Sequence, residues 1–189
     1  MKSLQPIGIF DSGVGGTSIW KEIHEYLPKE QTIYLADSKY APYGDKPKSE
    51  ILRLSIKNTE KLISLGCKLI VVACNTATTN AIDYLRNTYD IPFVAIEPAI
   101  KPAALSTKTK AVGILATRGT LNSALFTKTS ELYARDIELI EVIGKGLVPE
   151  IEAGRHLGEE VKRLLQIYLE PMLRKNIDYL VLGCSHYPY

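Results

Sequence analysis

The chain has little of several features that would assign it to a common class of protein. Its 189 residues include only three cysteines, and these lack C-x-x-C spacing. Such a sparse, odd set fits free thiols in a reducing cytosol better than a disulfide framework or a zinc site. No cluster of His, Cys, Asp and Glu has metal-ligand spacing, and no lysine stands out as an anchor for pyridoxal phosphate. We therefore expect neither a metal nor an organic cofactor.

Charge of one sign and long apolar runs are also missing. The net charge is +2 without a basic cluster, which gives no case for a nucleic-acid partner. No apolar run approaches the roughly 20 residues that cross a bilayer, and the N-terminus has no sustained apolar region typical of a secretory signal. These absences favour a cytoplasmic protein. The composition, 46% hydrophobic and 23% charged, is ordinary for a soluble globular protein.

Short apolar runs alternate with amphipathic stretches along the chain, which is typical of a parallel α/β fold. The apolar runs predict strands at residues 7–10, 32–36, 69–73, 92–96, 111–115, 138–143 and 179–182. The amphipathic stretches predict helices at residues 17–27, 49–64, 75–89 and 158–175, the second with Ser49 as its N-cap.

One order of elements occurs twice: a strand, a turn rich in glycine and hydroxyl groups, a helix, and later a strand that ends in cysteine. IGIF before DSGVGG opens the first copy, and AVGIL before ATRGT opens the second. The pattern predicts two related α/β lobes, residues 1–97 and 98–189, joined near Glu97-Pro98. Chance similarity between short apolar strands is the alternative, and the pattern alone does not separate the two.

Two cysteines lie in matching settings at the ends of apolar runs. Cys74 ends LIVVAC and Cys184 ends YLVLGC. In open α/β sheets ligands bind at the carboxyl ends of the strands, where both thiols would lie. Two thiols in equivalent places indicate two acid/base groups that act on one small molecule from opposite sides.

The neighbours of the two cysteines differ. A helix begins just after Cys74, and its dipole and free N–H groups should lower the pKa of the thiol. Asn75 and Thr76 add donors suited to a carboxylate. Ser185 and His186 follow Cys184, and His186 is close enough to polarise a thiol or a ligand. The alternatives are a buried structural cysteine at position 74 and a packing histidine at position 186.

Polar residues near other strand ends are weaker candidates. Asp11 and Ser12 precede glycines that let main-chain N–H groups approach a ligand, although neither a dinucleotide-binding nor a P-loop motif is present. Tyr43 and Gly44 lie in a loop of the kind that often covers sites. By itself Glu152 is interpreted more simply as a solvated acid. The third cysteine, Cys67, has no polar neighbours and is interpreted as structural.

Seven motifs in order make the chain resemble the glutamate racemases of the aspartate/glutamate racemase superfamily. They are IGIFDSGVGGTS, YLADSKYAPYGDK, LIVVACNTATTNA, AIEPAIKPA, VGILATRGT, VPEIEAG and YLVLGCSHYP. The resemblance implies two flavodoxin-like lobes with the site in the cleft between them. It also implies cofactor-independent racemisation, in which one thiolate removes the α-proton and the opposite thiol protonates the other face.

The resemblance assigns roles by position. Cys74 matches the residue that deprotonates D-glutamate, and Cys184 matches the one that deprotonates L-glutamate. Supporting catalytic roles are implied for Asp11, Glu152 and His186. Residues at positions that hold the substrate are Asp11, Ser12, Tyr43, Gly44, Asn75, Thr76, Thr117, Thr120, Ser185 and His186. In bacteria this family supplies D-glutamate for peptidoglycan synthesis, so we expect a cytoplasmic enzyme whose full-length form is a homodimer.

The chain also departs from the family pattern. The family usually has Thr where Ser185 stands, and the residues before Val148-Pro149 differ, which affects the alignment of Glu152. Family chains run further, and their C-terminal segment returns to complete the first lobe. We therefore expect that lobe to be incomplete, and residues 1–189 alone to be less stable than a full-length chain and nearly inactive.

Three other functions are also compatible with the sequence. One is racemisation of another acidic amino acid, such as aspartate. Another is a Cys–His hydrolase, in which one thiol is a nucleophile. The last is a catalytically silent binding or regulatory protein.

Overall fold

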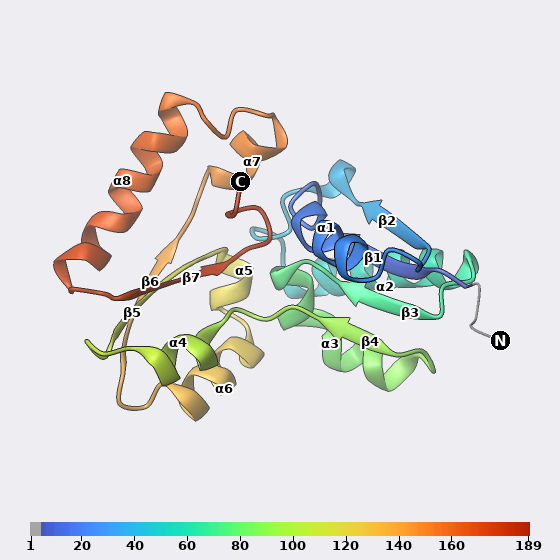
Figure 1. The fold of residues 1–189 in the computed structure, drawn as a ribbon, viewed down its shortest axis with the longest axis horizontal. Coiled ribbons are helices and arrows are strands. Elements are labelled where there is room, and N and C mark those ends of the chain that lie inside the picture. Colours follow the sequence, from blue (N-terminus) through green and yellow to red (C-terminus); the bar gives the residue numbers. More distant parts are fainter. Residues whose placement is uncertain (1–4) are drawn as a thin grey trace.

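The structure is a computed structural model, and it describes residues 5–189. Two parallel β-sheets lie side by side, each with helices on both faces (Figure 1). The predicted α/β fold with two parallel-sheet lobes is therefore confirmed. In the described part of the chain, no helix has the length and apolar character needed to cross a membrane.

The first sheet has the strand order β2-β1-β3-β4. Its strands are β1 (Ile7–Asp11), β2 (Thr32–Ala36), β3 (Leu69–Val72) and β4 (Phe93–Ala95). The helical segments of this lobe are α1 (Thr17–Tyr26), η1 (Ser38–Tyr40), α2 (Lys48–Ser64) and α3 (Asn75–Thr88). Side chains alternate across the central strand: Ile7 and Ile9 face α1, whereas Phe10 packs with α2 and α3.

The second sheet has the strand order β6-β5-β7. Its strands are β5 (Ala111–Ala116), β6 (Glu138–Ile143) and β7 (Tyr179–Gly183). The helices are α4 (Ile100–Ser106), α5 (Arg118–Leu121), α6 (Ala124–Tyr133), α7 (Leu147–Glu152) and α8 (Glu159–Arg174). Figure 1 shows α4 and α6 on one face of this sheet and α8 on the other, and each face has its own apolar cluster.

The two sheets repeat one arrangement. In the first lobe β1 lies between β2 and β3, and in the second lobe β5 lies between β6 and β7, with every pairing parallel. The chain leaves β3 at Cys74 and β7 at Cys184, so the two cysteines follow equivalent strands. The strand pattern agrees with the predicted repeat, while the lobe boundaries at residues 97 and 98 stay a prediction.

The structure corrects several local predictions. Helix α2 already begins at Lys48, after an extended Pro47, so Ser49 is not its N-cap. The short helices α4, α5 and α6 were not predicted. Each has few fully buried side chains, so no wide apolar stripe marks it in the sequence.

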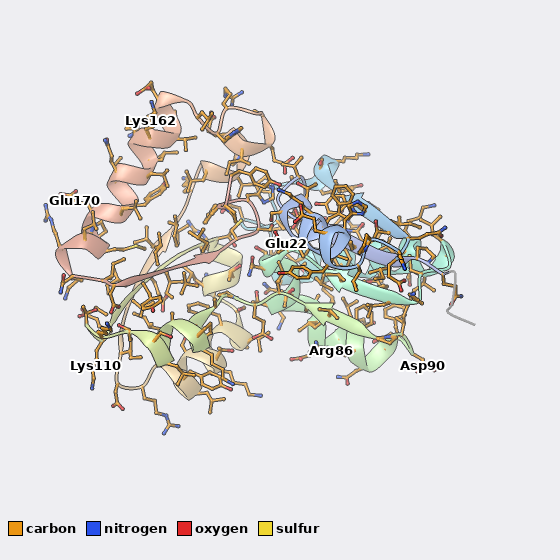
Figure 2. All side chains as sticks on the ribbon, in the orientation of Figure 1. Glu22, Arg86, Asp90, Lys110, Lys162 and Glu170 are labelled. Carbon is orange, nitrogen blue, oxygen red and sulfur yellow. The ribbon has the colours of Figure 1, made fainter. Side chains whose placement is uncertain are left out.

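Charged side chains lie on the outer surface of the helices. Figure 2 shows Arg86, Lys162 and Glu170 pointing away from the two sheets, and all three are exposed. By contrast, the polar side chains that follow β1, β3, β5 and β7 are buried between the lobes. A buried polar group is costly unless it has a partner, so this inner set is where a functional site is expected.

Candidate active site

Asp11 joins the two lobes. Its carboxylate is fully buried, with 0% exposure. One oxygen accepts a hydrogen bond from the Gly13 main chain at 2.9 Å, and the other accepts one from Ser185 Oγ of the second lobe at 2.8 Å. Burial raises the pKa of Asp11, and the charge of His186 and these hydrogen bonds offset the rise in part. The carboxylate therefore lies in a buried polar seam, which is the contact region between the ends of the two sheets.

Cys74 is the N-cap of α3. Its Sγ accepts a hydrogen bond from the main-chain N–H of Ala77 at 3.5 Å and lies 3.7 Å from Ser12 Oγ. The side chain is 3% exposed. Burial, followed by the charge of Asp11, raises the pKa of Cys74 to about 12.

The prediction of a lowered pKa for Cys74 is therefore wrong for this structure. The predicted helix N-terminus is present, and its N–H group does favour the thiolate. However, transferring a thiolate from water to a buried site costs more free energy than hydrogen bonds from one or two N–H groups recover. Burial therefore favours the thiol form of Cys74 over the thiolate in this structure.

Cys184 has a histidine as its neighbour. Its Sγ lies 3.8 Å from His186 Nδ1, and it is 7% exposed. Burial raises the pKa of Cys184 well above the ordinary value, and the main-chain N–H groups of His186 and Tyr187 lower it in part. The negative charge of Cys74, when that thiol is ionised, also raises this pKa. The two thiols are therefore within electrostatic reach of each other across the cleft.

Glu152 contacts His186 at the ring nitrogen that does not face Cys184. Its Oε1 lies 2.5 Å from His186 Nε2 and also accepts a hydrogen bond from the main-chain N–H of Val14 at 2.7 Å. Glu152 is the last residue of α7 and is only partly exposed, so the simpler interpretation as a solvated acid is wrong. The carboxylate orients the imidazole towards Cys184 and ties the glycine-rich turn to the second lobe.

Three threonine hydroxyls meet where the lobes touch. Thr76 Oγ1 lies 2.8 Å from Thr117 Oγ1 and 3.3 Å from Thr120 Oγ1, and the last two are 3.1 Å apart. All three side chains are buried, as is the neighbouring Asn75. Hydroxyls that can rotate to donate or accept are suited to a substrate carboxylate.

Gly44 contacts the second lobe through its main chain, whereas the Tyr43 side chain points into the first lobe. The Tyr43 ring is 1% exposed and lies in the core of the first lobe, where its hydroxyl donates to Asp37 Oδ2 at 2.6 Å. The Gly44 carbonyl accepts a hydrogen bond from the Gly119 N–H at 2.8 Å. If residue 43 binds a substrate, it must do so with its main chain.

The structure thus brings the candidate residues together. Ser12, Cys74 and Asp11 come from the first lobe, and Ser185, Cys184 and His186 come from the second. Cys67 instead packs in the apolar cluster beneath α2, as predicted for a structural cysteine. In the described residues, no group of three or more His, Cys, Asp and Glu could hold a metal ion.

Sequence analysis missed three polar residues that support this site. Asp37 comes directly after β2, just as Asp11 ends β1 and Cys74 lies just beyond β3, so the same search for polar residues at strand ends could have found it. Asn58 is fully buried and donates to the Tyr43 hydroxyl at 3.1 Å. Asn80 bonds the second lobe from α3, and its spacing of one helical turn from Thr76 was a usable signal.

Comparison with known proteins decides the family. A profile of the Asp/Glu/Hydantoin racemase family matches residues 7–189. The chain belongs to this family. It is 47% identical over 184 residues to the glutamate racemase of Cupriavidus pinatubonensis, a match that covers 97% of this chain and 68% of that one. The glutamate racemase of Ectopseudomonas mendocina is 46% identical, with 100% of this chain and 72% of that one covered.

Solved structures of family members have the same fold. Escherichia coli glutamate racemase, in complex with L-glutamate and the activator UDP-MurNAc-Ala, superposes with a TM-score of 0.85 at 39% identity and covers 97% of this chain and 71% of that one. The Francisella tularensis enzyme, in complex with D-glutamate, gives 0.83 at 34% identity, with 97% and 69% covered. An aspartate racemase homologue from Pyrococcus horikoshii gives 0.57 at 19% identity and shares the fold alone.

Proposed function

We propose that this chain interconverts L-glutamate and D-glutamate with two thiols and no cofactor. The observation that carries the proposal is the convergence of Cys74 and Cys184, one from each lobe, on the same buried seam beside Asp11. Two acid/base groups on opposite sides of one carbon are the requirement for inversion. The similarity to proteins named glutamate racemase supports glutamate as the substrate.

The reaction starts with one thiol ionised and the other protonated. With D-glutamate, the Cys74 thiolate takes the α-proton, so a C–H bond breaks and an S–H bond forms. The Cys184 thiol then gives its proton to the opposite face, which leaves L-glutamate and a Cys184 thiolate. With L-glutamate the same steps run in reverse, and the thiols exchange roles.

The buried site helps both steps. Charge that develops on the substrate carboxylate is stabilised by donors held in place before the reaction, here the hydroxyls of Thr76, Thr117 and Thr120. Because both thiols are buried, little water competes for these donors. His186 Nδ1 lies 3.8 Å from Cys184 Sγ, and the other ring nitrogen is bonded to Glu152. The imidazole can therefore exchange a proton with the Cys184 thiol.

The same proposal includes a biological role. We place the reaction in the bacterial cytoplasm, where it supplies D-glutamate for peptidoglycan synthesis, and we expect the full-length protein to form a homodimer. The resemblance described above supports this role.

Exchange of the α-hydrogen with solvent tests the reaction. Residues 1–189 and a full-length version are each incubated in D₂O with L-glutamate, D-glutamate or L-aspartate. The Cα signal is followed by proton NMR while a chiral assay follows inversion. From the full-length version we expect deuterium uptake and inversion with both glutamate enantiomers, and neither in its Cys74→Ser/Cys184→Ser double variant. Residues 1–189 alone should show little of either.

Each alternative gives a different result. Faster exchange with aspartate than with glutamate would assign the chain to the other acidic substrate. A covalent thioester without exchange would indicate a Cys–His hydrolase. Neither exchange nor adduct, from a full-length version with a cooperative thermal transition, would indicate a silent binding protein.

A further inference from the structure

Asn80 forms a hydrogen-bonded link between the lobes. It lies on α3, the helix that begins directly after Cys74. Its Nδ2 donates to the carbonyl of Thr76, one turn earlier on α3, and to the carbonyl of Gly119 in the second lobe, both at 2.9 Å. One side-chain amide thus holds α3 and α5 together.

The Gly119 peptide is held on both sides by the first lobe. Its N–H donates to the Gly44 carbonyl at 2.8 Å, and its own carbonyl accepts from Asn80. A Cβ at this position would lie 2.9 Å from Thr76 Cγ2 and 3.1 Å from the Gly44 oxygen. The approach of the lobes is therefore close enough to require glycine here.

The position of this link matters for the hydroxyl cluster. Gly119 lies between Thr117 and Thr120 in the chain, and the hydroxyls of both bond Thr76 at the start of α3. A shift of the Gly119 peptide would move these hydroxyls relative to Cys74. Displacements of about 1 Å in such positions are enough to lower rates by about 100-fold.

We propose that Asn80 is a positioning residue for the racemisation proposed above: it holds residues 117–120 of the second lobe against the helix that carries Cys74. Asn80 itself touches no reacting atom. It acts through the Gly119 peptide, and the proposal rests on the proposed function only for its catalytic consequence.

Asn80→Asp and Asn80→Ala test the link. Ionised Asp has nearly the shape of Asn but cannot donate, and it would face two carbonyl oxygens, which also raises its pKa. Protonation restores one donor. At pH 7 we expect the Gly119 amide to lose about 10-fold of its hydrogen-exchange protection in both variants. When the pH is lowered until the new carboxyl is protonated, protection should return in the Asp variant and not in the Ala variant.

Controls separate this effect from a general loss of stability. Asn80 and Asn122 both line a cavity of about 390 Å³ between the lobes. Asn122→Asp therefore places an equal charge nearby without breaking the link. We expect it to leave Gly119 protection unchanged. The amide of Val71, in the central region of the first sheet, should keep its protection in every variant. An equal loss at Val71 and Gly119 would overturn the proposal.

Kinetics complete the test. In the full-length version with glutamate we expect a lower kcat and a higher KM for Asn80→Ala, while Asn122→Asp keeps both. Lost Gly119 protection with unchanged kinetics would contradict the positioning role. If the full-length wild type shows no α-exchange, the proposed function fails, whereas the amide measurement still decides whether Asn80 holds the lobes.

Discussion

The two thiols occupy matching places but have different partners. Both follow an equivalent strand, both are buried and both feel the charge of Asp11. Cys74 has fixed partners, since a main-chain N–H at the start of α3 bonds its sulfur. Cys184 has a titratable partner, His186, which Glu152 supports.

This difference shows that a symmetric reaction does not need a symmetric site. A helix N-terminus offers the same partial charge at every pH. A histidine changes charge with pH and can carry a proton. The repeated strand order supplies the two positions, and the side chains around each position supply the chemistry. Changes to one thiol and its partners should therefore affect one enantiomer more than the other.

Replacing either thiol has the largest expected effect. In Cys74→Ser and Cys184→Ser we expect racemisation to fall by about 1,000-fold or more, because each direction needs both groups. Exchange without inversion should survive with one enantiomer only: D-glutamate in Cys184→Ser and L-glutamate in Cys74→Ser. Proton NMR in D₂O measures this, with Cys67→Ser as the matched control. Normal racemisation by either variant would rule out the two-thiol assignment.

Removing the carboxylate behind His186 should affect only the Cys184 side. Glu152→Gln is placed in each single-thiol variant, and exchange is measured with the surviving enantiomer. We expect a roughly 10- to 100-fold loss with L-glutamate in the Cys74→Ser background, and little change with D-glutamate in the Cys184→Ser background. Glu150→Gln, on the same helix but paired with the exposed Arg155, is the control. Equal losses on both sides would show that the two thiols share this pair.

Asp11→Asn should lower the pKa of both thiols. The carboxylate charge raises both values. At Cys74 it is the largest cause after burial, whereas at Cys184 it comes after burial, the main-chain N–H of His186 and the charge of Cys74. Thiolate absorbance against pH measures each shift, in variants that keep one cysteine each. An upward shift, or no shift at either thiol, would contradict the electrostatic role given to Asp11.

The smallest effect is on stability at high pH. Burial raises the pKa of Cys74 from 9.0 to about 12 in the folded state. Below pH 9 both states keep the proton, so stability is unaffected. As the pH rises from about 9 towards 12, the unfolded chain releases the proton first and stability falls, by at most about 1.4 kcal/mol per pH unit for one thiol.

Denaturant titrations between pH 8 and 10.5 measure this slope. Cys74→Ser and Cys184→Ser should each be less sensitive to pH than the wild type, because serine does not titrate there. Identical slopes in all three proteins would mean that neither thiol is protected from ionisation by the fold.

Much of the architecture was predictable because its signals are local. Apolar runs at β1, β3 and β5 mark strands that are buried, and such runs can be found without tertiary information. The run at β7 also marks a strand, although Tyr179, Leu180 and Leu182 on it are exposed. The short helices α4 and α6 have few fully buried residues, so they were missed. The N-cap of α2 was misplaced because Lys48 already belongs to the helix, behind Pro47.

For the site, the sequence indicates which residues take part, whereas the environment of each residue depends on the tertiary structure. The order of residues along the chain determined which side chains end the strands: Asp11, Cys74 and Cys184. Only the tertiary structure decided their properties. The pKa of Cys74 is raised because desolvation depends on what covers a group, and Glu152 supports His186 because α7 folds back onto the first turn. Sequence specifies local periodicity, whereas burial and contacts between the lobes arise only when distant segments pack together.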